Sequence, residues 1–234
     1  MSPDKKQPDQ QDLKLKVAER ALGLVKPGMT IGLGSGSTAS LWIQLLGKQV
    51  RDHGLQIRAV ASSETSESLG RSFGIPFLKL EDCEYLDLVV DGADEIAPEL
   101  ALIKGGGGNL LREKILATAT KQFVIIADEN KIVGRLGKFP LPVEVIPMAA
   151  SLVHRALEQL HFKAALRMKK DGSSPYITDE GNLLFDCSGG PIEDPQQLAA
   201  KLDRIVGLVE HGLFLNMASL ALIATDEGVF ERLS

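Results

Sequence analysis

The sequence has little cysteine and no excess of basic residues. Its two cysteines, Cys83 and Cys187, are far apart, and it has neither a CxxC pair nor histidines at metal-ligand spacing. These absences exclude a disulfide framework and a zinc cage. The formal net charge of −5 argues against a nucleic-acid partner, which would require a basic surface. With so few thiols, we expect a reducing, cytoplasmic location.

Long apolar runs are also missing. The longest apolar stretch, Leu213–Ala224, is interrupted by Asn216 and Ser219 and is shorter than the ~20 residues that cross a bilayer. The start, Met1–Gln11, is polar and lacks the apolar segment of a secretion signal. We therefore expect no membrane anchor, and a loose tail over residues 1–11.

The composition is that of a folded globular protein. Of 234 residues, 44% are apolar and 24% are charged, which excludes a wholly disordered or fibrous chain. The length fits one large domain or two modest ones.

Helical and strand patterns alternate over the first part of the chain. This alternation predicts a doubly wound, mostly parallel, Rossmann-like sheet. The expected helices are Leu13–Val25, Ala39–Val50 and Leu110–Thr120, and the expected strands are Met29–Leu33, Ile57–Ala61, Leu86–Val90 and Phe123–Ala127.

The pattern changes beyond Lys138, where prolines become frequent. We expect a smaller inserted α+β, ferredoxin-like domain over 137–207, and a first domain formed by 1–136 and 208–234, with Leu213–Ala224 returning to its sheet as a buried strand. The elements expected in the insert are strands Val143–Ile146, Ala164–Met168, Tyr176–Thr178 and Asn182–Asp186, and helices Met148–Leu160 and Pro195–Ile205.

A glycine-rich turn, Gly34-Ser-Gly-Ser-Thr38, joins an expected strand to an expected helix. It fits the loose dinucleotide pattern G-x-G-x-x-A, but the next strand ends in Ala61 and Ser62, where an acidic residue would bind ribose. It is not a P-loop, because no lysine precedes Ser37 or Thr38. A phosphate site at the helix N-terminus and an ordinary tight turn both fit it.

Three carboxylates, Asp91, Asp94 and Glu95, follow the end of a predicted strand. Carboxylates this close repel one another unless a cation compensates, and Lys104 is the nearest candidate. A turn with a helix cap and a magnesium site are the alternatives.

Four glycines follow Lys104 and precede Asn109. Ordering them costs much backbone entropy, which favours a ligand-binding loop over a flexible linker. Glu113 lies in the first turn of the next helix, where it could act chemically or only complement the helix dipole. The four histidines lie outside these clusters, and we expect them in core or surface positions. We expect Trp42 in the core rather than stacked on a ligand.

Together these segments closely resemble the type A ribose-5-phosphate isomerase family. The resemblance runs from about Leu13 to the C-terminus. It is carried by four segments: Gly32-Leu-Gly-Ser-Gly-Ser-Thr-Ala39, Asp91-Gly-Ala-Asp-Glu95, Lys104-Gly-Gly-Gly-Gly-Asn-Leu-Leu-Arg-Glu-Lys114 and Gly137-Lys-Phe-Pro-Leu-Pro-Val-Glu-Val-Ile-Pro147.

The resemblance implies interconversion of D-ribose 5-phosphate and D-ribulose 5-phosphate, in the non-oxidative pentose phosphate pathway, without metal or nucleotide. It also implies a homodimer or homotetramer, and we expect the smaller domain at the interface between subunits. The implied catalytic residues are Glu113 as the base, with Asp91, Asp94 and Lys104. The implied substrate-binding residues add Lys14, Gly34, Ser35, Gly36, Ser37, Thr38, Gly92, Ala93, Gly105, Gly106 and Lys131.

Two other functions compete with this one. The first is a sugar-phosphate-sensing domain of the same fold, which would bind its ligand without turnover. The second is a nicotinamide-dependent oxidoreductase, against which the missing ribose-binding acid argues.

Overall fold

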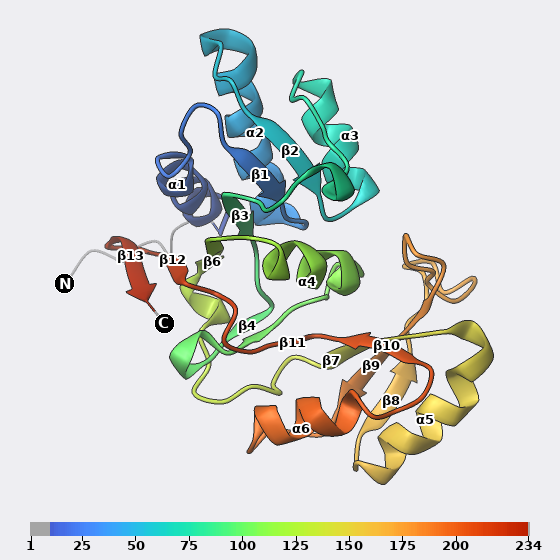
Figure 1. Ribbon diagram of the computed structural model, residues 1–234. Coiled ribbons are helices and arrows are strands. Elements are labelled where there is room, and N and C mark those ends of the chain that lie inside the picture. Colours follow the sequence, from blue (N-terminus) through green and yellow to red (C-terminus); the bar gives the residue numbers. More distant parts are fainter. Residues whose placement is uncertain (1–9, 234) are drawn as a thin grey trace, which may run out of the picture.

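A computed structural model describes residues 10–233 (Figure 1). Residues 1–9 of the expected loose tail lie outside the described part. The first helix, α1, spans Gln10–Leu22, so the expectation of a tail was wrong for Gln10 and Gln11. Their helical state follows from the buried stripe of Leu13, Val17 and Ala21, whose four-residue spacing fixes this helix against the core.

A six-stranded sheet forms the centre of the first part of the molecule. Its order is β13-β12-β6-β3-β1-β2, and every neighbouring pair is parallel except β12 with β13. This arrangement confirms the predicted mostly parallel α/β fold. The strands are β1 Thr30–Leu33, β2 Arg58–Ala61, β3 Leu88–Asp91, β6 Phe123–Asp128, β12 Leu220–Thr225 and β13 Gly228–Leu233.

Both faces of this sheet are covered. On one face, α1, α2 (Ser37–His53) and α3 (Glu64–Ser72) share a core with Leu33 and Trp42, and Trp42 is fully buried as expected. On the other face, α4 (Leu110–Thr118) packs on Val89 and Phe123. Within residues 10–233, no helix has the length and apolar character that crossing a membrane requires.

A second, antiparallel sheet lies below the first in Figure 1, in the order β10-β7-β9-β8. Helices α5 and α6 cover one of its faces, and α4 contacts β7 and β10 from the first part of the molecule. The bounds are β7 Leu141–Val145, α5 Ala150–Gln159, β8 Lys163–Leu166, β9 Leu183–Ser188, α6 Pro195–Leu202 and β10 Leu208–His211.

Three short strands connect the two sheets. They form a small antiparallel sheet in the order β11-β5-β4, with bounds β4 Glu95–Ile96, β5 Leu102–Ile103 and β11 Leu213–Phe214. Single 3₁₀ turns occupy Leu80–Asp82, Pro98–Leu100, Glu129–Lys131 and Pro147–Ala149. The division into domains at 137 and 207 remains a proposal. Strand β10, which follows the second boundary, pairs with β7 and so belongs to the four-stranded sheet.

Two local expectations were wrong. Tyr176–Thr178 is not a strand, because only the isolated bridges Met168–Pro175 and Ile177–Leu183 form there. Leu213–Ala224 is two strands, since Asn216 takes a positive φ of 55° and turns the chain between β11 and β12. Helix α3, for which no element was expected, begins after β2, where the Ser63 side chain accepts a hydrogen bond from the N–H of Ser66 as the N-cap.

Candidate active site

The segments singled out in the sequence meet at the carboxyl ends of β1 and β3. These strands are neighbours, and the chain leaves β1 into α2 on one face while α4 covers the other. Ligands of open α/β sheets bind at such a switch point. The fold therefore brings the glycine turn, the acidic cluster and the four-glycine loop to one place.

The glycine turn after β1 lies directly against Asp91. The N–H of Gly34 donates to the carbonyl of Val90 over 3.0 Å, and a Cβ at position 34 would lie 2.2 Å from Cγ of Asp91. Gly36 precedes α2 with a φ of +90°, a conformation that glycine adopts without cost. Both glycines are needed for the turn to approach the acidic cluster.

One buried lysine joins two buried carboxylates. Lys104 Nζ lies 2.9 Å from Oδ2 of Asp91 and 3.2 Å from Oε2 of Glu113, and it donates to the carbonyl of Gly92 over 2.7 Å. Exposed fractions are 1% for Asp91, 2% for Lys104 and 4% for Glu113. Charges this deeply buried are tolerated only when they are paired.

Burial shifts the pKa values of this group. Desolvation, with the charge of Glu113 adding to it and Lys104 opposing it, raises the pKa of Asp91 from 3.8 to about 7. Desolvation also opposes charge on Lys104, but the carboxylates of Asp91 and Glu113 outweigh it and raise the pKa of the ammonium. Lys104 is therefore a fixed cation, and Asp91 can exchange a proton near neutral pH.

Ser35 links the carboxylates to the glycine turn. Its hydroxyl donates to Oε1 of Glu113 over 2.6 Å, and its N–H donates to Oδ1 of Asp91 over 2.9 Å. The side-chain amide of Asn109 donates to the Ser35 hydroxyl over 3.3 Å. These contacts fix the Glu113 carboxylate at the start of α4.

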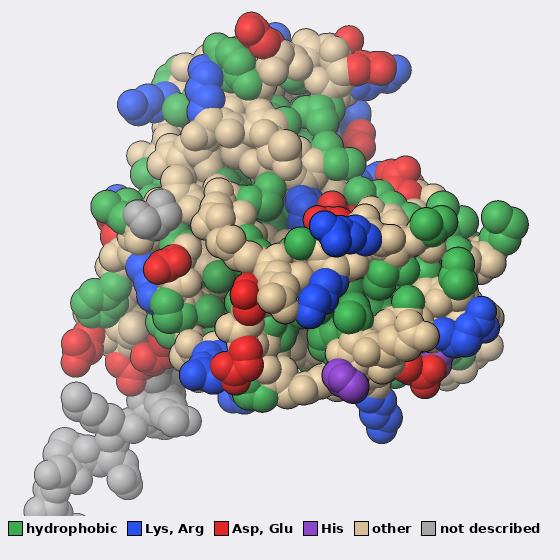
Figure 2. Space-filling view, turned by 60° about the horizontal axis from the view of Figure 1, so that its bottom comes forward, with side chains coloured by type: hydrophobic (Ala, Val, Ile, Leu, Met, Phe, Trp, Pro, Cys, Tyr) green, Lys and Arg blue, Asp and Glu red, His purple; other side chains and the backbone are tan. Residues whose placement is uncertain are grey.

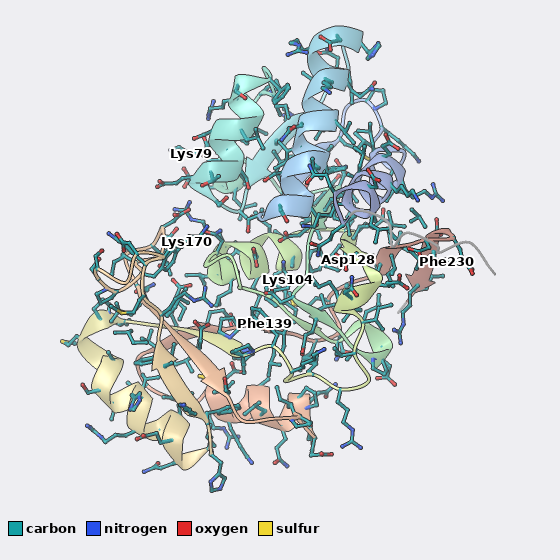
Figure 3. All side chains as sticks on the ribbon, turned by 180° about the vertical axis from the view of Figure 1, so that it is seen from behind. Lys79, Lys104, Asp128, Phe139, Lys170 and Phe230 are labelled. Atoms are coloured by element: carbon teal, nitrogen blue, oxygen red, sulfur yellow. The ribbon has the colours of Figure 1, made fainter. Side chains whose placement is uncertain are left out.

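Ser35, Lys104 and Glu113 border a cavity of about 140 Å³. Figure 3 shows Lys104 in the middle of the molecule, between the larger and the smaller sheet. Of the residues predicted for the site, Asp91 and Gly34 lie behind the wall and the others line it. The lining residues are Gln10, Lys14, Ser35, Gly36, Ser37, Thr38, Gly92, Ala93, Asp94, Lys104, Gly105, Gly106, Gly107, Glu113 and Lys131.

Polar groups from three further segments reach the same cavity. Asp94 accepts a hydrogen bond from the N–H of Gly106 over 2.7 Å. Burial raises the pKa of Asp94, while this hydrogen bond and the charges of Lys104 and Lys131 oppose the shift. Lys14, on α1, donates to the hydroxyl of Ser37 over 3.0 Å. Two lysines therefore lie at the cavity wall, Lys14 near the start of α2 and Lys131 near Asp94. Their positive charges could attract an anion.

Glu95 does not join the acidic cluster at the cavity. Its carboxylate accepts hydrogen bonds from the N–H groups of Gly137 and Phe139, over 2.7 and 2.6 Å. Gln10 and Gly107 line the cavity but were not predicted. Nothing in the sequence around Gln10 indicates a place at the site. Gly107 belongs to the four-glycine run, and this could have indicated its place there.

The arrangement suits proton transfer on a small anionic substrate. A carboxylate that lines the cavity, a fixed ammonium and backbone N–H groups can move a proton and stabilise an oxyanion. Among residues 10–233, no three histidine, cysteine or acidic side chains are grouped as metal ligands.

Comparison with known proteins gives consistent matches over the chain. The family model described as ribose 5-phosphate isomerase A (phosphoriboisomerase A) matches residues 58–228. Ribose-5-phosphate isomerase A of Parvibaculum lavamentivorans is 46% identical over 93% of this chain and 96% of its own.

Solved structures agree with this match. Ribose 5-phosphate isomerase A of Methanocaldococcus jannaschii is similar with a TM-score of 0.92 and 41% identity, over 97% of this chain and 100% of that one. A D-ribose-5-phosphate isomerase in complex with phospho-erythronic acid has a TM-score of 0.94 and 36% identity, with the same coverage.

Proposed function

The chain belongs to the ribose 5-phosphate isomerase A family, and we propose that it interconverts D-ribose 5-phosphate and D-ribulose 5-phosphate. The observation that carries this proposal is the buried group of Glu113, Lys104 and Asp91 at one cavity. An aldose–ketose isomerase needs a base for one C–H proton and a cation for the oxygen charge, and this group supplies both.

We propose that the phosphate binds at the start of α2. The side chains of Ser37 and Thr38, the helix N-terminus and Lys14 lie at this part of the cavity wall. N–H groups and the positive end of the helix dipole favour an anion there. The open-chain sugar would then extend toward Asp94 and Glu113. Bound phospho-erythronic acid in a relative supports a sugar-phosphate ligand.

In the proposed reaction, Glu113 removes the proton from C2 of the open aldose, and the C2–H electrons form the C1–C2 double bond of an enediol. O1 gains a proton as its charge develops, and the loss of the O2–H proton in the next step balances this, so that one proton passes in net from O2 to O1. The O2–H proton then leaves, a carbonyl forms at C2, and Glu113 returns a proton to C1. Lys104 and loop N–H groups stabilise the oxygen charge, and Asp91 with Asp94 transfers hydroxyl protons during ring opening.

The direct test follows ketose formation from ribose 5-phosphate and loss of deuterium from C2-labelled substrate. We expect Glu113→Gln to lower kcat by at least 10²-fold, because a general base contributes about 10²- to 10⁴-fold to the rate. The affinity for the sugar phosphate should change only a few-fold. Binding without turnover by the unaltered chain would instead indicate a sensor. Near-normal turnover by Glu113→Gln would remove Glu113 as the base.

We also propose a homo-oligomer, in the cytoplasm, that associates through the smaller unit, by which we mean the four-stranded sheet β10-β7-β9-β8 with helices α5 and α6. Support for the interface comes from Met148 and Val206, whose exposed fractions are 95% and 79%, and hydrophobic side chains are frequent over this part of the surface in Figure 2. Free Cys83 and Cys187 are compatible with a reducing compartment.

A further inference from the structure

Two carbonyl groups of the four-glycine loop accept hydrogen bonds from an arginine of the smaller unit. Arg167 directly follows β8 and its side chain is 14% exposed. Its Nη1 donates to the carbonyl of Gly105 over 3.0 Å and to that of Gly106 over 3.2 Å. Both glycines line the active-site cavity, whereas Arg167 does not. The arginine therefore contacts the loop from outside the cavity.

A second residue fixes the arginine. Asp186, on β9, accepts a hydrogen bond from Nε of Arg167 over 2.9 Å and another from Nη2. This is the bidentate pairing that the planar guanidinium makes with a carboxylate. Because the other terminal nitrogen points at the two carbonyls, one rigid group joins β9 to the loop. A lysine, with its single point charge, cannot make all these contacts.

Because the peptide group is planar, the contact of Arg167 with the two carbonyls also sets the direction of the N–H groups on the other side of the loop. In a trans peptide the carbonyl and the N–H point in opposite directions. Since the carbonyls of Gly105 and Gly106 point at Arg167, the N–H groups of Gly106 and Gly107 point away from it. The first of these donates to Asp94 at the cavity wall, over 2.7 Å. The second belongs to Gly107, which also lines the cavity.

The loop cannot keep this orientation by itself at low cost. Glycine has the largest backbone entropy to lose on ordering, and four glycines occur in sequence here. Two of them, Gly105 and Gly108, have φ values of +98° and +93°. The loop also has bonds of its own, from the N–H of Gly108 to the carbonyl of Gly105 and from the N–H of Gly106 to Asp94. These leave the carbonyl of Gly106 to Arg167. Without the arginine, the peptide between Gly106 and Gly107 can rotate and turn the N–H of Gly107 out of the cavity.

We propose that Arg167, held by Asp186, is a positioning residue that aims the N–H groups of Gly106 and Gly107 into the active site. There the N–H of Gly107 stabilises the oxygen charge that develops in the enediol step. The proposal rests on the isomerase function and adds to it a required residue from the smaller unit.

Kinetics of matched variants give the first test. We expect Arg167→Met to lower kcat about 10- to 100-fold, as a misplaced catalytic group does, with a smaller change in KM. Arg167→Lys should restore little of this loss, and Asp186→Asn should show a milder loss. The control is Arg135→Met, which removes an exposed pair with Glu193 away from the cavity and should change kcat less than two-fold.

Ligand binding separates positioning from a merely structural role. Phospho-erythronic acid carries a carboxylate where the enediol carries developing charge, whereas ribitol 5-phosphate is neutral at that place. We expect Arg167→Met to weaken binding of the acid at least ten-fold and binding of ribitol 5-phosphate less than three-fold. Equal losses for both ligands, or an unchanged kcat, would overturn the proposal. An inactive unaltered chain would instead overturn the isomerase function.

Discussion

At the scale of single residues, the site depends on a balance between one cation and three carboxyl groups. Lys104 is paired with Asp91 and Glu113 and lies near Asp94. Truncating a buried, paired charge leaves its partners uncompensated and costs several kcal/mol. For this reason each member affects both the fold and the protonation of the others, and isosteric changes are the informative ones.

The raised pKa of Asp91 predicts a pH dependence of activity. Burial favours the neutral form of Asp91, whereas hydrogen bonds from Lys104 and from the N–H groups of Ser35 and Gly92 favour the carboxylate. These three donors are satisfied only by the ionised form, which we take as the active one. We expect kcat/KM to rise with pH through about 7, where Asp91 loses its proton. A pH–rate profile between 5 and 9 measures this.

Asp91→Asn is the control for that profile. The amide does not titrate, so the rising limb near pH 7 should disappear, at a lower overall rate. If the variant keeps the same limb, another group is responsible for it.

Gly34→Ala should disrupt the site through a single methyl group. The added Cβ would lie 2.2 Å from Cγ of Asp91, and overpacking of this kind costs about 1–3 kcal/mol. We expect a lower free energy of unfolding in urea and a loss of about 10²-fold in kcat/KM, because Asp91 must move. Gly134→Ala is the matched control, since no atom lies within 4 Å of its added Cβ. Equal behaviour of the two variants would contradict this assignment.

Much of the site could be predicted from single residues, because glycine runs and strand-end carboxylates are local signals. Ser37, Asp94, Lys104 and Glu113 lie in such motifs and meet at one cavity. Arg167 lies in no motif, and its contact with the loop depends on how the smaller sheet is placed. Long-range contacts of this kind leave no trace in a single sequence.

At the scale of elements, α4 connects the active site to the smaller sheet. Glu113 points to the cavity, while the next residue, Lys114, donates to Oε1 of Glu210 and to the carbonyl of His211, each over 2.6 Å. Burial lowers the pKa of Lys114, against the opposing charge of Glu210. The helix that carries the proposed base is thereby attached to β10.

Lys114→Met should detach this connection. It removes the ammonium group shared by Glu210 and the carbonyl of His211 and leaves the Glu210 carboxylate with the N–H of His211 as its donor, at a cost of about 2 kcal/mol. Urea unfolding measures the loss. The control is Lys79→Met, since the Lys79–Glu81 pair is exposed and should contribute within ~0.5 kcal/mol. If Lys114→Met lowers the free energy of unfolding no more than the control does, the contact of Lys114 with β10 does not stabilise the protein.

The parallel strands were predicted well because they are short, apolar and almost fully buried, as in β3 and β6. Helix α3 was not predicted, since its buried residues include only Ser66 and Gly70 and give no apolar stripe. The two-residue strands β4 and β5 pair with each other and β5 also pairs with the distant β11; strands this short carry no alternating pattern that could indicate them.

At the scale of the whole molecule, the proposed oligomer makes a prediction about the surface of the smaller unit. We expect sedimentation equilibrium to give a dimer or tetramer for the unaltered chain. Met148→Glu with Val206→Glu should shift it toward monomers, because buried charge without a partner opposes association. The matched double variant Phe230→Glu with Leu233→Glu, on exposed β13 residues, should leave the assembly unchanged. A monomeric unaltered chain, or the opposite ranking of the two variants, would contradict this interface.

The position of β12 has a consequence for biosynthesis. This strand, near the end of the chain, pairs with β6 almost a hundred residues earlier, and it also supports β13. While the ribosome is still adding residues of the smaller unit, β6 has an open edge that nothing later in the chain can yet cover. The nascent protein must wait for its last segment, so stalled translation beyond β10 would yield a product prone to aggregation.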